Sequence, residues 1–108
     1  MQVKQALIKA RELIADRNHW TQGASARDDR GAPVPYTDPD AMCWCSMGAI
    51  GKVVSEAEQT PVGVVIALRG GIKHLKSFTS FTSIASFNDN STHTQVLEAF
   101  DKAIENAS

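Results

Sequence analysis

A long, nearly uncharged segment in the middle of the chain constrains the fold more than any other feature. Between residues 42 and 54 the only charged residue is Lys52. Asp38 and Pro39 precede it in the order of a helix cap and a first-turn proline, a position where proline loses no hydrogen bond. At about 100° per residue, apolar side chains would cover opposite faces of a helix here, and such a helix packs on all sides. We therefore predict a central helix over residues 38–57.

Both ends of the chain also have the pattern of amphipathic helices. Apolar residues recur at helical spacing in residues 3–16, with charged residues on the other side. A second such pattern covers residues 92–106 and opens at Thr92 with a Thr-x-x-Gln capping box. We expect Phe100 in this second helix, together with Trp44 of the central segment, to lie in the core.

The segment after the central helix is ambiguous between helix and strand. Residues 62–68 are rich in β-branched side chains, which suit a strand. Thr60 and Pro61, however, again give a cap followed by a first-turn proline, so we predict a helix. The pair Gly70 and Gly71 should end or kink it.

A short hairpin is the one β element that the sequence predicts. Residues 28–31, Asp-Asp-Arg-Gly, are typical of a tight turn between extended segments at 24–27 and 32–34. Pro33 and Pro35 limit the second segment to the edge of a sheet. The predicted fold is mainly α: a compact single domain of residues 1–108, built as a bundle of four to six helices with a small β-hairpin insertion.

Composition narrows the classes of partner and the compartment. With 11 Lys and Arg against 12 Asp and Glu, the chain lacks the basic excess of a nonspecific nucleic-acid binder. No run approaches the roughly 18 apolar residues of a membrane span, and the charged N-terminal helix is not a secretory signal. On a helix Cys43 and Cys45 would point about 200° apart, so we expect two free thiols. We therefore expect a cytoplasmic protein that binds neither membrane nor nonspecific nucleic acid.

Two familiar site motifs fail on inspection. Gly48-Ala-Ile-Gly51-Lys52 has too few residues between its glycines for a phosphate-binding loop, and its helical setting favours a packing role. His19 and His74 have no ligand partner at useful spacing, so we expect no metal site. No cofactor motif is present, and we expect no cofactor.

One set of residues has the chemistry of a cysteine nucleophile. Cys45 would be the nucleophile and His93 the base, with Asn88 or Asp89 orienting the imidazole. This would make the protein a small cysteine-dependent hydrolase or transferase. The alternative is that Cys45, on the same helical face as core residues, is a buried structural cysteine, and we favour this second interpretation.

The polar segments offer candidate contact surfaces. Asn88, Asp89 and His93 form either a structured turn between helices or an exposed recognition corner at a helix N-terminus. The hairpin tip and the loop after it add a second candidate surface, formed by Arg27, Asp28, Arg30 and Tyr36. With no complete catalytic motif, a non-catalytic protein that docks onto a macromolecular partner, most readily a protein, is the leading interpretation.

Three stretches resemble a family of small uncharacterised proteins from bacteria and their phages. They are residues 20–34 (WTQGASARDDRGAPV), 44–50 (WCSMGAI), and 83–89 (SIASFND) followed by 92–104 (THTQVLEAFDKAI). The family pattern has a W-C-x-x-G-A-L core, a W-N-D loop and a T-H-x-x-V-L-x-x-F-D helix; Phe87 and Ile50 are conservative departures from it. The resemblance implies one compact unit and no particular activity. The most specific form of the docking interpretation is a phage-encoded inhibitor of a host machine.

Overall fold

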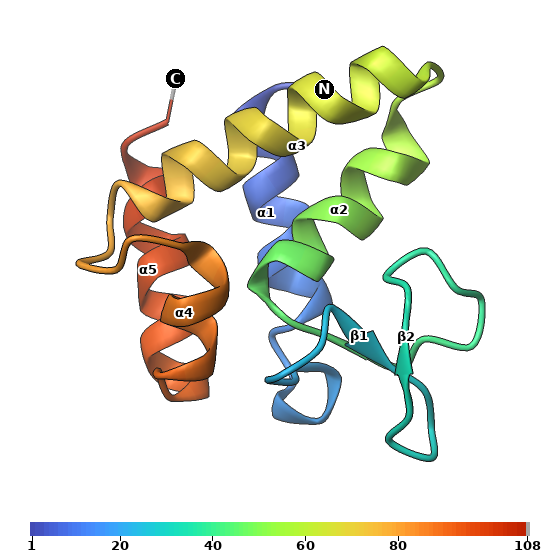
Figure 1. The fold of residues 1–108 in the computed structure, drawn as a ribbon. Coiled ribbons are helices and arrows are strands. Elements are labelled where there is room, and N and C mark those ends of the chain that lie inside the picture. Colours follow the sequence, from blue (N-terminus) through green and yellow to red (C-terminus); the bar gives the residue numbers. More distant parts are fainter. Residues whose placement is uncertain (108) are drawn as a thin grey trace.

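Five α-helices and a three-stranded antiparallel sheet make up the fold (Figure 1), in a computed structural model that describes residues 1–107. This confirms the prediction of a mainly α fold with a small β insertion. The helices are α1 (Val3–Leu13), α2 (Ser46–Ala57), α3 (Pro61–Lys76), α4 (Ile84–Asp89) and α5 (His93–Glu105), with a 3-10 helix η1 at Arg17–His19. The strands are β1 (Ala26–Arg27), β2 (Pro33–Val34) and β3 (Cys43–Trp44).

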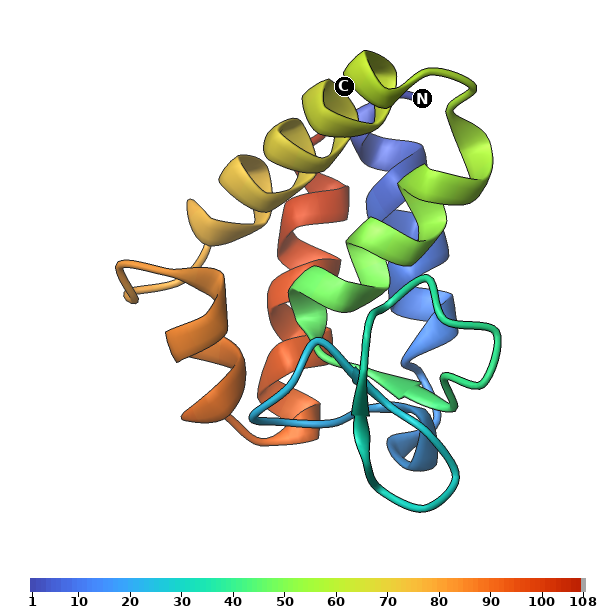
Figure 2. The same ribbon diagram turned by 45° about the vertical axis from the view of Figure 1, so that its right-hand side comes forward.

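The core lies between α1, α2 and α5, and α3 crosses the end of the bundle where both chain termini lie (Figure 2). Fully buried large side chains come from all four of these helices: Leu7, Ile50, Val54, Leu75, Val96 and Phe100. Burying each contributes about 1.5–3 kcal/mol before conformational entropy is counted. Trp44 and Phe100 are both buried, as the sequence predicts.

Local capping sets the start of α3 and of α5 as predicted. The Thr60 hydroxyl accepts a hydrogen bond from the Gly63 N–H at 3.0 Å, and Pro61 follows at the first helical position. Thr92 and Gln95 form a complete capping box on α5. Residues 62–68 are therefore helical, as predicted.

The sequence predicts that the Gly70-Gly71 pair ends or kinks this helix, and the first of these two outcomes is wrong. The helix runs on to Lys76 because tertiary packing uses the missing side chain. A Cβ on Gly71 would lie 3.0 Å from Ile50 of α2, tighter than ordinary contact. Glycine here lets α3 approach α2 closely.

The predicted start of the central helix at Asp38 is wrong. The Asp38 carboxylate instead accepts the Asp40 N–H at 2.8 Å within a turn, and α2 begins only at Ser46, capped by Cys45. Between them Cys43 and Trp44 form β3, which pairs with β1. A short apolar segment such as residues 42–45 fits the hydrophobic spacing of a helix and of a strand equally well. The free edge of β1 supplies backbone hydrogen bonds, and these favour the strand. The first helix also ends early, at Leu13 rather than residue 16.

The hairpin matches its prediction. β1 and β2 pair antiparallel, and the strand order β2-β1-β3 leaves the proline-bearing β2 at an edge. The Asp28 carboxylate closes the turn by accepting the N–H groups of Arg30 and Ala32, both at 2.9 Å. Gly31 takes a φ of 80°, which favours glycine.

The two glycines of α2 confirm the packing interpretation of the Gly48-x-x-Gly51 motif. A Cβ on Gly48 would lie 2.0 Å from the backbone oxygen of Ser25, and one on Gly51 would lie 2.6 Å from the Tyr36 ring. The hairpin region therefore rests directly on the backbone of α2.

Candidate functional site

The side chain of Asn88 is the centre of a buried hydrogen-bond network. Its Oδ1 accepts from Trp20 Nε1 at 2.8 Å, from the Ser46 N–H at 2.9 Å and from the Ser46 hydroxyl at 2.7 Å. Its Nδ2 donates to the Thr21 carbonyl at 2.9 Å. Asn88 and Ser46 are fully buried, so of the two interpretations of residues 88–93 the exposed recognition corner is wrong for Asn88. The residue joins η1, the start of α2 and the end of α4.

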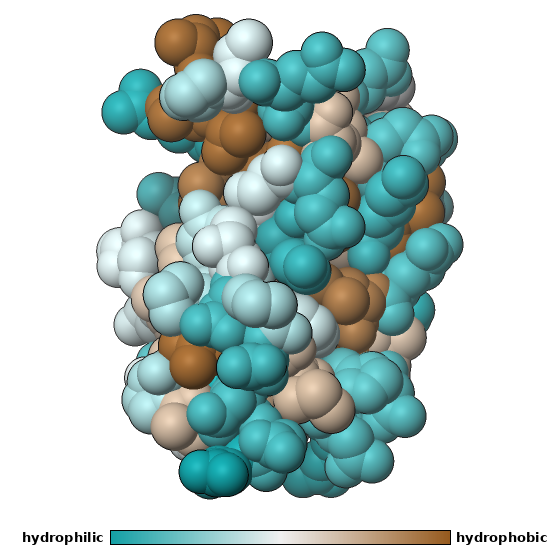
Figure 3. Space-filling view, turned by 90° about the vertical axis from the view of Figure 1, so that its right-hand side faces the viewer, coloured by the Kyte–Doolittle hydropathy of each residue, from teal (hydrophilic) through white to brown (hydrophobic). Residues whose placement is uncertain are grey.

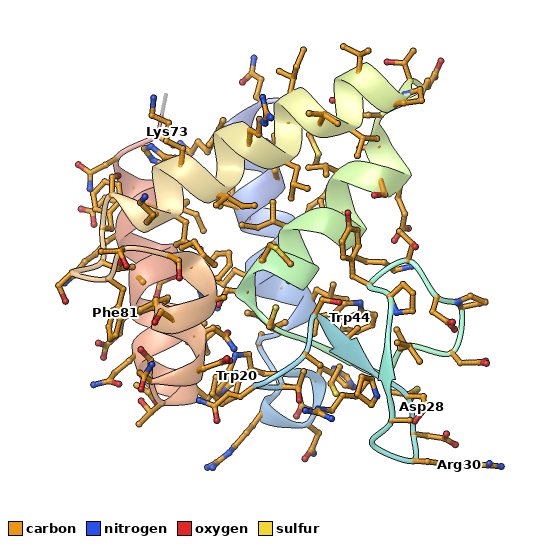
Figure 4. All side chains as sticks on the ribbon, viewed as in Figure 1. Trp20, Asp28, Arg30, Trp44, Lys73 and Phe81 are labelled. Carbon is orange, nitrogen blue, oxygen red and sulfur yellow. The ribbon has the colours of Figure 1, made fainter. Side chains whose placement is uncertain are left out.

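Backbone contacts extend this joint to the surface. The side-chain Nε2 of Gln22 donates to the backbone carbonyls of Asn88 and Ser91, both at 2.9 Å, and the backbone N–H of Gly23 donates to Asp89 Oδ1 at 2.9 Å. In Figure 4 the Trp20 side chain lies beside the α4–α5 pair. Exposed Asp89 therefore also holds the 20–23 segment in place.

His93 is engaged by the end of α1. Its Nε2 lies 2.7 Å from the Ile14 carbonyl oxygen, and its ring centroid lies 5.4 Å from that of Trp20. A carbonyl only accepts, so Nε2 carries the proton in this contact. The imidazole therefore fastens the first turn of α5 to α1.

The Cys45 thiol is in a setting that disfavours the thiolate. It is 7% exposed, and its Sγ accepts the Gly48 N–H at 3.3 Å as the cap of α2. Burial raises the pKa of the thiol, and the Asp89 carboxylate raises this pKa further, whereas the N–H groups at the helix start oppose the shift. A nucleophilic cysteine needs the opposite, a lowered pKa and partial exposure.

The structure brings only part of the proposed cysteine site together. Cys45 and Asp89 line one hollow of about 210 Å³, with Ala24, Met47 and Ala85 among its other walls. Among the described residues that line this hollow, His93 is absent. Asn88, predicted to orient the imidazole, instead forms side-chain hydrogen bonds with Trp20, Thr21 and Ser46.

Most of the predicted hairpin residues are engaged in contacts within the protein. The Arg27 guanidinium donates to the Thr21 hydroxyl at 3.1 Å and to the carbonyls of Gln22 and Gly31, both at 3.0 Å. The Tyr36 ring covers Gly51. Arg30 is exposed and, with Asp28, points away from the helices (Figure 4). The Tyr36 ring packs on α2, whereas no side-chain hydrogen bond or ion pair within residues 1–107 engages Arg30.

A shallow hollow opens beside this tip. It has a volume of about 460 Å³ and is lined by Asp28, Asp29, Arg30, Pro39, Asp40 and Met42. Met42 is 51% exposed and forms its apolar part. The 38–42 loop thus adds residues that the sequence prediction did not include.

The sequence analysis also missed an apolar surface on the first half of α3. Val62 and Ile66 are each 67% exposed and Val65 is 48% exposed. Figure 3 shows hydrophobic side chains gathered at the end of the molecule where α2 leads into α3. The predicted helix contained a signal for this surface. A helix at the edge of a bundle buries only one face, and residues 62–68 carry apolar side chains on more than one face, so some of them must be exposed.

Residues 1–107 contain no group of three or more His, Cys, Asp or Glu side chains that could hold a metal ion. None of their helices is long and apolar enough to cross a membrane.

Comparison with known proteins gives one match. The sequence pattern of a family described as a family of unknown function (DUF6197) matches residues 1–106. No curated protein and no solved structure matches the chain.

Proposed function

The chain belongs to this family of unknown function, and we propose that it is a non-catalytic binding protein that docks onto another protein. The observation that carries the proposal is the α3 patch, defined as Val62, Val65 and Ile66. These side chains lie on the outside of a well-capped helix and are half to two-thirds exposed. Contiguous exposed apolar side chains are typical of a protein-binding surface.

The size of the patch supports a useful gain in affinity. Fully burying a Val or Ile side chain is worth about 1.5–3 kcal/mol, so covering the exposed parts of three yields about 3–5 kcal/mol. Each 1.4 kcal/mol is tenfold in affinity, so the patch supplies about two to four orders of magnitude. Polar contacts around the α3 patch would supply the remaining affinity.

The hairpin tip is the second candidate contact surface. Asp29 and Arg30 lie there on a turn that hydrogen bonds of Asp28 and Arg27 close, and Asp40 and Met42 come from the neighbouring 38–42 loop. A rigid, exposed loop limits the entropy that binding must remove. The most specific form of the proposal, a phage-encoded protein that blocks a host machine, is supported by the three-stretch resemblance described above.

Affinity capture from a bacterial lysate tests the proposal. The wild-type protein, Ile66→Asp, Arg30→Glu and the control Glu105→Lys would be immobilised and the bound proteins quantified by mass spectrometry. We expect one specific protein that wild type and Glu105→Lys retain and Ile66→Asp loses. If only Arg30→Glu fails to capture this protein, the docking site is the hairpin tip and not the α3 patch. A lysate that yields no specific protein, or one retained by every variant, would contradict the proposal.

A further inference from the structure

We propose that the outer face of α3 binds an acidic amphipathic helix of the partner in antiparallel orientation. This inference rests on the docking function proposed above and specifies the chemistry of the partner. Its basis is a line of exposed residues that continues the α3 patch toward the C-terminus of the helix: Val62, Ile66, Arg69, Lys73 and Lys76.

The spacing of this line suits another helix. Its members alternate at intervals of four and three residues, so they form one seam along the helix. α3 has 16 residues and is therefore about 24 Å long at 1.5 Å per residue. Apolar anchors at such intervals are typical of helix-on-helix recognition.

The charge along the seam specifies what faces it. Val62 and Ile66 make the first half apolar, and Arg69, Lys73 and Lys76 make the second half cationic. α3 contains no Asp or Glu. Within residues 1–107 none of the three cations forms an ion pair. The complementary surface is apolar at one end and acidic at the other.

The helix dipoles fix the direction. Acidic side chains are most stable in the first turns of a helix, and cations in the last turns, where α3 carries Lys73 and Lys76. An antiparallel partner places its acidic first turns against those cations and its later, apolar turns against Val62 and Ile66. A parallel partner would need its acidic residues at its own C-terminus, where the dipole disfavours them.

A second copy of this chain is a poorer fit. The acidic residues near the start of α3 are already engaged: Glu56 pairs with Lys52 at 3.0 Å, and Glu58 pairs with the amino group of Met1. An antiparallel copy would therefore leave Arg69 and Lys73 without free carboxylates. A membrane surface fits less well too, because the seam has no Trp, Tyr or Phe to anchor in the interface.

Designed peptides test the inference with purified protein. The probe is a fluorescent helical peptide as long as α3, with Glu in the seam of its first half and Leu in the seam of its second half. One control peptide exchanges the two halves, and another has Lys in place of Glu. Binding would be followed by fluorescence anisotropy at low and high salt, with far-UV circular dichroism to verify that each variant folds.

We expect the Glu-first peptide to bind most tightly and to weaken as salt rises. Lys73→Glu should weaken it about tenfold, whereas Lys102→Glu, a charge-matched change on α5, should not. The double variant Arg69→Glu/Lys73→Glu should instead prefer the Lys peptide. Equal affinity for all three peptides, or no binding, would overturn the inference. So would α3-dependent self-association in sedimentation, or binding to anionic vesicles that Ile66→Asp abolishes.

The two proposals fail separately. If Ile66→Asp abolishes lysate capture while no peptide binds, docking through α3 stands and the acidic helix is wrong. If the peptides bind as expected but no lysate protein is captured, the chemistry of the seam stands and the docking function is contradicted.

Discussion

Asn88→Ala is expected to lower the free energy of unfolding by about 3–5 kcal/mol, a large share of the 5–15 kcal/mol of a typical domain. The substitution removes an acceptor from three donors and a donor from one carbonyl. A buried polar group left without its partner costs about 1–3 kcal/mol. The two Ser46 groups are fully buried and contribute most of the loss. Trp20 and Thr21 are partly exposed and regain water, so they contribute less.

Urea unfolding followed by far-UV circular dichroism measures this effect, because the fluorescence of Trp20 would change locally. The matched control is Asn90→Ala, an exposed residue whose amide donates only to the Ser86 carbonyl. We expect it to cost less than about 1 kcal/mol. In a Trp20→Phe background the cost of Asn88→Ala should fall by about 1 kcal/mol, as expected for two groups in one network. Equal losses for Asn88→Ala and Asn90→Ala would refute the assignment of Asn88 as the joint.

Two other sites give sharp expectations. Gly48→Ala places a Cβ against the Ser25 backbone and should cost at least about 2 kcal/mol, whereas Gly70→Ala meets only the Val3 side chain, at 3.2 Å, and should change stability by less than about 1 kcal/mol; similar melting temperatures would contradict this. Iodoacetamide should modify Cys43 in the native protein and Cys45 only after denaturation; equally fast modification would contradict the burial argument. Burial raises the pKa of folded Cys45, so its contribution to stability is present below the unfolded value of about 8.5 and is lost as pH rises through the folded value. In Cys45→Ala the free energy of unfolding should therefore fall less between neutral and alkaline pH than in the wild-type protein. An equal fall in both proteins would contradict the raised pKa of Cys45.

Features set by neighbouring residues were predictable from the sequence. The caps at Thr60 and Thr92 and the turn at residues 28–31 depend on side chains that act within four residues of themselves. A cap or a tight turn needs no distant partner, so its residue types identify it.

Features set by distant partners were not predictable. The segment that forms β3 became a strand because Ala26 pairs with Trp44, a contact that no local pattern contains. Asn88 has the residue type of a surface turn, yet its partners are residues 20, 21 and 46. The α3 patch could not be located from the sequence for a related reason. An apolar segment does not indicate which of its faces the rest of the chain will cover.

The position of Asn88 in the chain also sets an order of events during synthesis. Residues 20, 21 and 46 receive their shared partner only after α4 has been made, although they belong to segments finished much earlier. A ribosome adds about 5–20 residues per second, so the first N–H of α2 stays hydrated for seconds while the chain grows. Such long-range contacts are expected to form late in folding, since they close the largest loops. A chain that stops before α4 would contain α1, α2 and α3 but would lack both α5 and the contact that joins η1 to α2.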